Sequence, residues 1–213
     1  MSSYFAVVDG SMPGIYADPS YYGYYEEFNC YSDAFDYMCQ YRHQVANFTE
    51  EYGDTEFRTR NGTATVYVHG VCSHNGYHDA NAGYGIFWGY EHENNVAGPL
   101  LGYQTNNLAV LKAVLVAMLQ ALESGHTRLV LRTNSRYIYK HIKNDVYRWA
   151  QNNWRKTNGK PLKNVDMLQE YIHLANKFAK NCLNFVYTPL LACYGSRMAS
   201  ALAQDGKQMK RSY

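Results

Sequence analysis

The sequence predicts an α/β domain over residues 63–208, and three observations support this class. Two apolar segments of strand-like composition, Thr63–Val71 and Gly83–Gly89, come first. A long helix follows at Asn106–Ser124, where apolar residues recur every three or four positions and Gly125 ends the pattern. Beyond this helix, strand-like and helix-like segments alternate, which is typical of a mixed sheet covered by helices.

Shorter segments complete a predicted order of three strands, a helix, a strand, helices, a strand and a terminal helix. The strands are apolar runs bounded by turn-forming residues, whereas the helices carry apolar residues at helical spacing. We expect strands at Val96–Gly102, Thr127–Thr133 and Cys182–Thr188, and helices at Ser135–Lys143, Asn164–Lys180 and Gly195–Gln204.

Residues 1–50 predict a separate small domain. β-forming residues at Tyr4–Val8 and Ile15–Tyr16 flank a turn that contains glycine and proline, which indicates a hairpin. The tyrosine-rich segment Ser20–Phe28 is expected to form a short helix. A third strand or a sheet edge is expected at Phe35–Tyr41.

Charge is distributed unevenly on the two sides of a polar segment, residues 51–62, that we predict to be a linker. Residues 1–60 hold ten acidic and three basic side chains, a balance of −7, and residues 61–213 hold eight and seventeen, a balance of +9. A basic C-terminal part attracts phosphates and an acidic N-terminal part repels them. Two modules with different partners would explain the split, and so would a scatter of solvated charges.

The composition excludes several other classes of protein. The hydrophobic fraction of 46% is ordinary for a globular chain. No run of about 18 apolar residues predicts a membrane span, and no basic segment followed by an apolar run predicts a secretory signal. The five scattered cysteines indicate reduced thiols. We therefore expect an intracellular protein of the nucleus or cytoplasm, not a secreted one, with no membrane partner.

Four motifs in the C-terminal part share one resemblance. They are Tyr67-Val68-His69-Gly70, Gln104-Thr105-Asn106, Thr133-Asn134-Ser135 and the segment from Gly195 to Ser200. With their flanking residues, they resemble a type 1 ribonuclease H, the family that cuts the RNA strand of RNA–DNA hybrids. The resemblance implies a ribonuclease H-like fold over residues 63–208, with a five-stranded mixed sheet flanked by helices.

The opening of the chain carries a second resemblance. Tyr4-Phe5-Ala6-Val7, followed by a Gly-x-x-Pro-Gly-Ile-Tyr turn, is similar to the small α+β hybrid-binding (viroplasmin-like) domain of these enzymes. The aromatic and lysine contacts that such a domain offers to nucleic acid are absent here. Instead, acidic residues surround a group of rigid, amphipathic side chains typical of protein interfaces: Tyr21, Tyr22, Tyr24 and Tyr25. They predict a protein-binding surface, and the alternative is a small core built from tyrosine.

Carboxylates are missing from the positions that the family uses for catalysis. The resemblance expects four of them, at the positions of His69, Val110, Asn134 and Ser200. Two divalent metal ions repel each other and need anionic oxygens to share a site, and these side chains supply none. His69 would even add positive charge if it were protonated. We therefore predict a pseudoenzyme with no catalytic residue, no metal and no cofactor.

Polar and aromatic residues at other family positions predict residual nucleic-acid binding. The resemblance assigns them to contacts with RNA hydroxyls, to a phosphate pocket and to a basic protrusion; they are Asn75, Thr105, Asn106, Asn107, Trp149, Arg155, Lys156 and Asn164. Two departures weaken the prediction. Tyr103 stands in place of a phosphate-binding arginine, and Asp145 in place of a tryptophan that supports the DNA strand.

Two functions follow from these features. In the first, the chain is a catalytically inactive, non-cleaving binder of RNA or an RNA–DNA hybrid that acts within a larger complex. In the second, it is a protein-interaction scaffold whose acidic, tyrosine-rich N-terminal domain docks a partner, without nucleic-acid binding. Strong salt dependence of nucleic-acid affinity would favour the first hypothesis.

Overall fold

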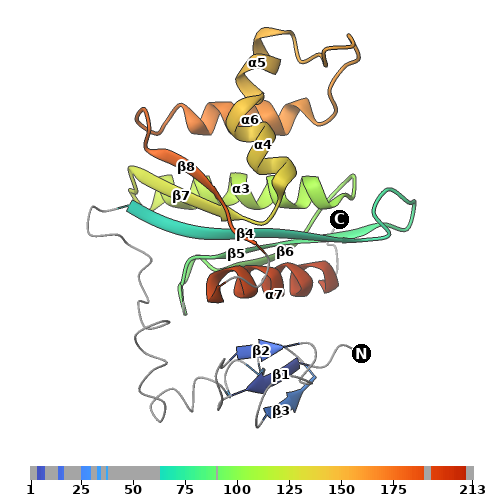
Figure 1. Cartoon of the computed structure of the whole chain (residues 1–213), viewed down its shortest axis with the longest axis vertical. Coiled ribbons are helices and arrows are strands. Elements are labelled where there is room, and N and C mark those ends of the chain that lie inside the picture. The colour runs from blue at the N-terminus through green and yellow to red at the C-terminus, as the bar shows by residue number, and fades with distance from the viewer. Residues whose placement is uncertain are drawn as a thin grey trace. The chain divides into compact units, whose positions relative to one another are not determined.

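The chain folds into two compact units in the computed structural model, Met1–Thr55 and Glu56–Tyr213. Each unit is described by itself (Figure 1). The structure describes residues 4–7, 14–16, 25–29, 33–34, 37, 63–89, 91–189 and 193–209. The linker expected at residues 51–62 and the boundary expected at residue 50 lie outside these ranges and stay predictions.

The N-terminal unit contains a small antiparallel sheet in the order β2-β1-β3. The opening hairpin is confirmed, with β1 (Tyr4–Val7) paired to β2 (Gly14–Tyr16). The helix expected over residues 20–28 is wrong where the structure describes it, because Tyr25–Phe28 forms strand β3. This strand pairs with the other edge of β1 and so satisfies its main-chain donors and acceptors.

The strand or edge expected at Phe35–Tyr41 is also wrong at its one described residue. Tyr37 is helical, as are Asp33 and Ala34. Ala34 is fully buried. The Tyr37 ring lies 5.2 Å from that of Phe28 on β3. Tertiary packing of these apolar groups has outweighed the strand-like local sequence.

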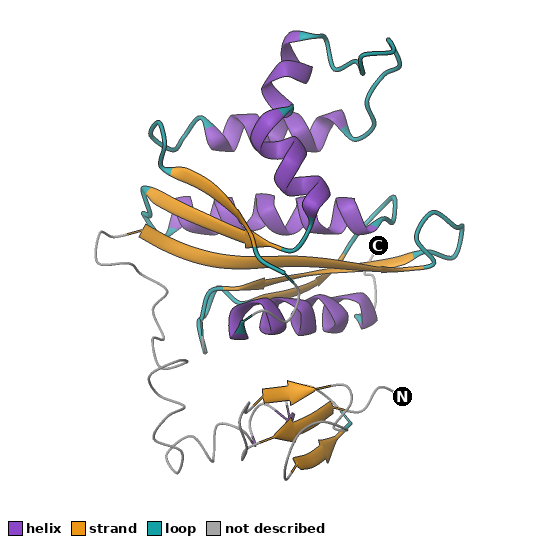
Figure 2. Ribbon diagram, viewed as in Figure 1, coloured by secondary structure: helices purple, strands orange, loops and turns teal. Residues whose placement is uncertain are grey.

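The C-terminal unit is built on a five-stranded mixed sheet, as predicted, in the order β6-β5-β4-β7-β8 (Figure 2). The central strand β4 runs parallel to β7, which runs parallel to β8, whereas β5 and β6 are antiparallel. The strands are β4 (Thr63–Ser73), β5 (Asn81–Phe87), β6 (Val96–Pro99), β7 (Arg128–Thr133) and β8 (Leu183–Tyr187).

Helices cover both faces of this sheet, as Figures 1 and 2 show. One face carries the long core helix and three shorter ones: α3 (Asn106–Glu123), α4 (Arg136–Asn144), α5 (Val146–Gln151) and α6 (Val165–Ala175). The other face carries α7 (Tyr194–Gln208), which packs on β4, β5 and β6. The main core therefore lies between the sheet and α3, where Val66, Ile86 and Leu115 are fully buried.

Helix α3 forms where the apolar spacing predicted it. The hydroxyl of Thr105 caps it by accepting from the backbone N–H of Leu108 at 3.2 Å. By length and composition α3 is also apolar enough to cross a membrane, which the sequence analysis did not anticipate. More than half of it is buried inside the unit, and the core helix of a globular domain passes the same test.

Several boundaries differ from the sequence prediction, and one helix was not expected. Strand β6 ends at Pro99, which has no N–H of its own, although the N–H of Leu100 still donates to the carbonyl of Ala82 at 2.9 Å. Helix α6 ends at Ala175, five residues before Lys180, since the chain turns back there and the N–H of Phe178 donates to the carbonyl of Ala175 at 3.1 Å. Helix α5 was not expected as a separate element. It begins directly after Asp145, at the end of α4.

Candidate functional site

Two of the four positions that lack a carboxylate meet at the centre of the sheet. β4 and β7 are parallel neighbours, with Val68 opposite Thr133, so the residues that follow, His69 and Asn134, lie side by side. The Nδ1–H of His69 donates to Oδ1 of Asn134 at 2.7 Å. This hydrogen bond uses the amide oxygen of Asn134, the one ligand atom that a cation would prefer there.

The other two positions differ in their placement. Val110 is fully buried on α3, and its backbone nitrogen would lie 2.4 Å from a Cβ added at Gly70, so α3 touches β4 beside His69. Position 110 thus borders the same centre. Ser200 is half-buried on α7. It does not line the cavity at His69, where Ser196 and Ala199 represent that helix.

Burial controls the charge of His69. The side chain is 8% exposed, and this burial lowers its pKa, while the hydrogen bond to Asn134 opposes the shift. Burial thus disfavours the protonated imidazole, the form in which His69 was expected to add positive charge. A neutral imidazole is a potential metal ligand, but His69 has no anionic neighbour among the described residues around it.

The space at this centre, which we call the central cavity, is small. It is lined by Tyr67, Val68, His69, Arg132, Thr133, Asn134, Thr188, Ser196 and Ala199. Its free volume is about 10 Å³, which is near the minimum for a single water molecule. Among the described lining residues, Arg132 is the one charged group. In the part of the chain that the structure describes, no three His, Cys, Asp or Glu side chains lie close enough together to hold a metal ion.

Two buried hydrogen-bonding atoms face the central cavity. In the described part of the chain, Nε of Arg132 and Oγ1 of Thr188 have no hydrogen-bond partner. The guanidinium of Arg132 also lies 5.8 Å from the centre of the Tyr67 ring. The cavity therefore presents the cationic guanidinium of Arg132, and this positive charge disfavours a divalent cation on electrostatic grounds.

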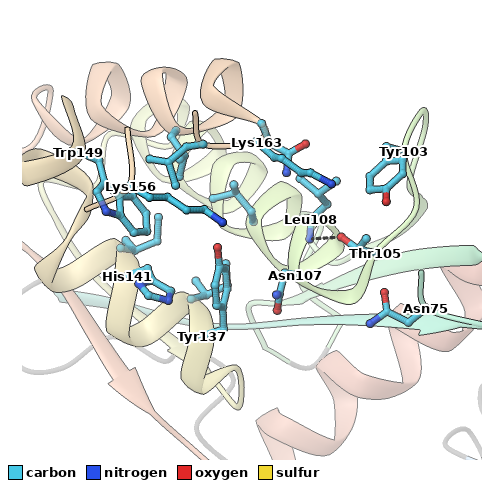
Figure 3. Close-up of a pocket in the computed structure, with 16 residues that line it drawn as sticks. Asn75, Tyr103, Thr105, Asn107, Leu108, Tyr137, His141, Trp149, Lys156 and Lys163 are labelled. Atoms are coloured by element: carbon cyan, nitrogen blue, oxygen red, sulfur yellow. Dashed lines mark hydrogen bonds between the residues drawn. The ribbon is translucent and has the colours of Figure 1, made fainter. Parts of the chain in front are cut away.

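A much larger depression, which we call the groove, opens between the beginnings of α3, α4 and α6, α5 and the loop that follows it. Its volume is about 300 Å³ (Figure 3). It is lined by Asn75, Tyr103, Thr105, Asn107, Leu108, Leu111, Tyr137, Ile138, His141, Ile142, Trp149, Lys156, Leu162, Lys163, Asn164 and Leu168. Apolar side chains make its floor, and aromatic, amide and ammonium groups surround them.

The groove gathers most of the residues that the sequence predicted for nucleic-acid binding. Six of them line it: Asn75, Thr105, Asn107, Trp149, Lys156 and Asn164. They come from the β4–β5 turn, the start of α3, α5, the following loop and the start of α6. The structure thus brings together side chains that lie up to 89 positions apart, from 75 to 164.

Two predicted residues lie outside the lining of the groove. Asn106 is the first residue of α3 and is half-buried. Arg155 donates from Nη1 to the carbonyl of Gly159 at 2.9 Å, which braces the loop after α5. The neighbouring Gln104 is structural, because its buried amide accepts from Ala82 and donates to the carbonyls of Leu100 and Gly102.

Sequence reasoning missed three residues of the groove. Tyr137 and His141 lie one turn apart on α4, and their ring centres are 4.3 Å apart. Lys163 comes directly before Asn164, and its Nζ lies 5.9 Å from the centre of the Tyr103 ring. The i, i+4 spacing of Tyr137 and His141 was a readable signal for a shared helix face. The sequence did not predict whether that face points into a groove or towards solvent, because α4 has no long apolar stripe.

Asp145 has a different environment from the one its position implied. Its carboxylate binds Nδ1 of His141 at 2.7 Å through one oxygen and the guanidinium of Arg148 at 2.6 Å through the other. The charge of Asp145 is thereby offset at the edge of the groove. The same contacts fix the His141 ring, whose centre lies 5.0 Å from that of Trp149.

The predicted protein-binding tyrosines are not placed by the structure. Tyr21, Tyr22 and Tyr24 lie outside the described residues, and Tyr25 is described only through its backbone in β3. The protein-binding surface therefore stays a prediction.

Comparison with known proteins identifies the C-terminal unit. The family model RNase H matches residues 61–206. A ribonuclease H1 of Mus musculus is 34% identical over 142 residues, which are 66% of this chain and 49% of that protein. A ribonuclease H of Schizosaccharomyces pombe is 32% identical over 142 residues, 66% of this chain and 52% of that protein. The chain thus spans about half the length of the curated relatives it matches.

Solved structures agree on the fold. The foamy viral protease-reverse transcriptase in complex with RNA/DNA hybrid matches with a TM-score of 0.58 at 24% identity, over 68% of this chain and 20% of that one. LC9-RNase H1, a type 1 RNase H with the type 2 active-site motif, matches with a TM-score of 0.51 at 25% identity, over 68% and 72%. With its mixed sheet, its central strand and the matching family model, this chain belongs to the type 1 ribonuclease H family.

Proposed function

We propose that this chain is a non-cleaving member of its family, one that binds an RNA–DNA hybrid or RNA and leaves it intact. The proposal rests on one contrast: the groove keeps six of the predicted binding residues, whereas the carboxylate positions hold His69, Val110, Asn134 and Ser200. Its relatives are named ribonucleases H, and the family acts on hybrids, so the same ligand class is the natural expectation for the groove.

The central cavity supports the loss of cleavage. Two-metal hydrolysis needs anionic oxygens that hold the cations and offset the charge of the reacting phosphate. The cavity offers a neutral His69, an amide already bonded to it, and the cation of Arg132. Its free volume of about 10 Å³ is close to that of a single water molecule.

The groove supports retained binding. Lys156 and Lys163 bring positive charge to its wall, and Asn75, Asn107 and Asn164 offer amide groups that donate to hydroxyl and phosphate oxygens. No carboxylate is among the residues that line it. Its affinity should therefore fall as salt rises, since each neutralised phosphate releases counterions.

The test is a titration of labelled RNA–DNA hybrid by anisotropy at about 150 mM salt with Mg²⁺, with duplex RNA and duplex DNA alongside, and a gel for cleavage. We expect binding of intact hybrid. The double variant Lys156→Gln/Lys163→Gln should weaken it. Lys180→Gln serves as the matched control, because Lys180 is exposed and lines a different pocket. Mg²⁺-dependent cleavage by the purified chain would refute the proposal.

The scaffold hypothesis remains the alternative. If neither hybrid nor duplex binds, a protein partner of the N-terminal domain becomes the better explanation. Membership of a larger complex and an intracellular location also stay predictions.

A further inference from the structure

We propose that the groove accepts a single unpaired nucleotide, whose base stacks on an aromatic wall formed by Tyr137, His141 and Trp149. This inference rests on the proposed function and narrows its ligand. It favours hybrid or RNA that contains a bulge, a loop or an end, because those places offer a base that can leave its stack.

The size and shape of the groove fit one nucleotide. Its volume of about 300 Å³ lies at the lower end of the range, about 300–1,000 Å³, that is usual for small-ligand pockets. Its floor is apolar, from Leu108, Ile138 and Leu168. A duplex contacts protein mainly through phosphates and sugars on a surface, whereas an apolar, concave floor suits a planar base.

Aromatic rings line one side of this space. Tyr137 is 46% exposed on the first turn of α4, so one face of its ring is open to a ligand. His141 supports it, with an edge-on contact at 4.3 Å, and Trp149 continues the wall at 5.0 Å from His141. In Figure 3 the three rings lie in succession along one side of the groove.

Fixed geometry makes this wall a platform. Nδ1 of His141 bonds to the Asp145 carboxylate, which Arg148 holds from its other oxygen. Asp145 stands where the family resemblance expects a tryptophan, so one aromatic contact has been replaced by a pair that anchors His141. The aromatic surface of the groove is therefore carried mainly by α4, through Tyr137 and His141. A base stacked on α4 would lie differently from one stacked on a tryptophan at position 145.

Positive groups lie where the phosphate of that nucleotide would be. Figure 3 shows Lys156 reaching towards the middle of the groove from the side of Trp149, and Lys163 extending on the side of Tyr103. The start of α3, an 18-residue helix with no acidic residue in its first turn, adds its backbone N–H groups beside Thr105 and Asn107. A base on the wall and a phosphate near these groups place one nucleotide across the groove.

The experiment compares hybrids that differ at one place. A continuous hybrid, a hybrid with a one-nucleotide bulge in either strand, and the same hybrid with an abasic bulge are titrated by anisotropy. We expect the bulged hybrid to bind about tenfold tighter than the continuous one, in line with the stacking of one base. The abasic bulge should bind like the continuous hybrid.

Tyr137→Leu keeps apolar bulk but removes the ring, and it should abolish the preference for the bulge. Tyr147→Leu is the matched control, because Tyr147 is also 46% exposed and helical but lines another pocket. Equal binding of abasic and intact bulges would overturn the inference, and so would an unchanged preference for the bulge in Tyr137→Leu. In either case, binding of the continuous hybrid would still support the proposed function. Absence of all binding would reject both.

Discussion

The central cavity and the groove differ in size and in the groups that they offer to a ligand. The central cavity holds a buried imidazole and an amide that are bonded to each other, whereas the two other positions without a carboxylate, Val110 and Ser200, lie outside its lining. In the groove, polar and aromatic side chains are still assembled around a space about thirty times larger, about 300 Å³ against about 10 Å³. Chemistry that depends on charge can disappear while packing stays, because a buried neutral group needs no compensating ion.

The groove tolerates change for a different reason. Most of its polar residues lie at the beginnings of helices or in loops, whereas apolar lining residues such as Leu111 and Ile142 belong to the core. Exchange of one aromatic or charged group there alters ligand geometry and leaves the sheet and α3 intact. The comparison therefore separates a site closed by packing from a surface that stays open to binding.

The largest expected effect comes from placing carboxylates at the four positions where the family resemblance expects them. The variant His69→Asp/Val110→Glu/Asn134→Asp/Ser200→Asp should gain Mg²⁺-dependent cleavage of a hybrid. We expect the rate to rise at least about 10³-fold over background, because metal catalysis contributes several kcal/mol. A gel assay of labelled RNA would measure it. The triple variant that keeps Asn134 is the control, and an inactive fourfold variant would show that the geometry has also been lost.

Val110→Glu alone should destabilise the C-terminal unit by about 3 kcal/mol, because a fully buried carboxylate without metal or partner loses its hydration. Urea unfolding followed by circular dichroism measures this loss. Leu119→Glu is the control on the same helix, since Leu119 is 37% exposed and should change stability little. Equal free energies of unfolding for the two variants would contradict the burial of position 110 in the core beside His69.

Within the loop after α5, two neighbouring cations should behave differently. Lys156→Gln should weaken hybrid binding about threefold and lower the slope of log affinity against log salt by about one. Arg155→Gln should leave the slope unchanged, because Arg155 bonds to Gly159 and lies outside the groove. Anisotropy titrations at four salt concentrations measure this slope for each variant. A lowered slope in Arg155→Gln would extend the interface onto the protrusion.

The smallest effect concerns pH. Burial lowers the pKa of His69 in the folded state, so the unfolded chain binds a proton first as the pH falls below about 6.5. This part of the stability is present above that pH and is lost towards the lower folded pKa. His69→Gln should therefore reduce the fall in urea midpoint between pH 7 and pH 5. If the urea midpoint falls equally in the wild-type protein and in His69→Gln, the pH dependence arises from other histidines.

Much of the fold was predictable because local patterns and tertiary packing agree. Leu108, Leu111, Leu115 and Met118 recur at helical spacing, and all four are buried in α3. In the N-terminal unit the local pattern and the tertiary packing disagree. The local sequence predicted a helix at Tyr25–Phe28, but this segment pairs with the second edge of β1 as a strand. The ends of β6 and α6 also escaped prediction, since they depend on where the chain must turn towards its next element.

The sequence by itself determined the family, the four expected positions at which no carboxylate stands, and six of the residues that line the groove, because those features depend on residue identity at spaced positions. Only the tertiary structure decided that Asn134 bonds to His69, that Asp145 anchors His141, and that Tyr137 and Lys163 join the groove. The physical reason is that burial, hydrogen-bond partners and the direction of a helix face arise from contacts between segments distant in the chain.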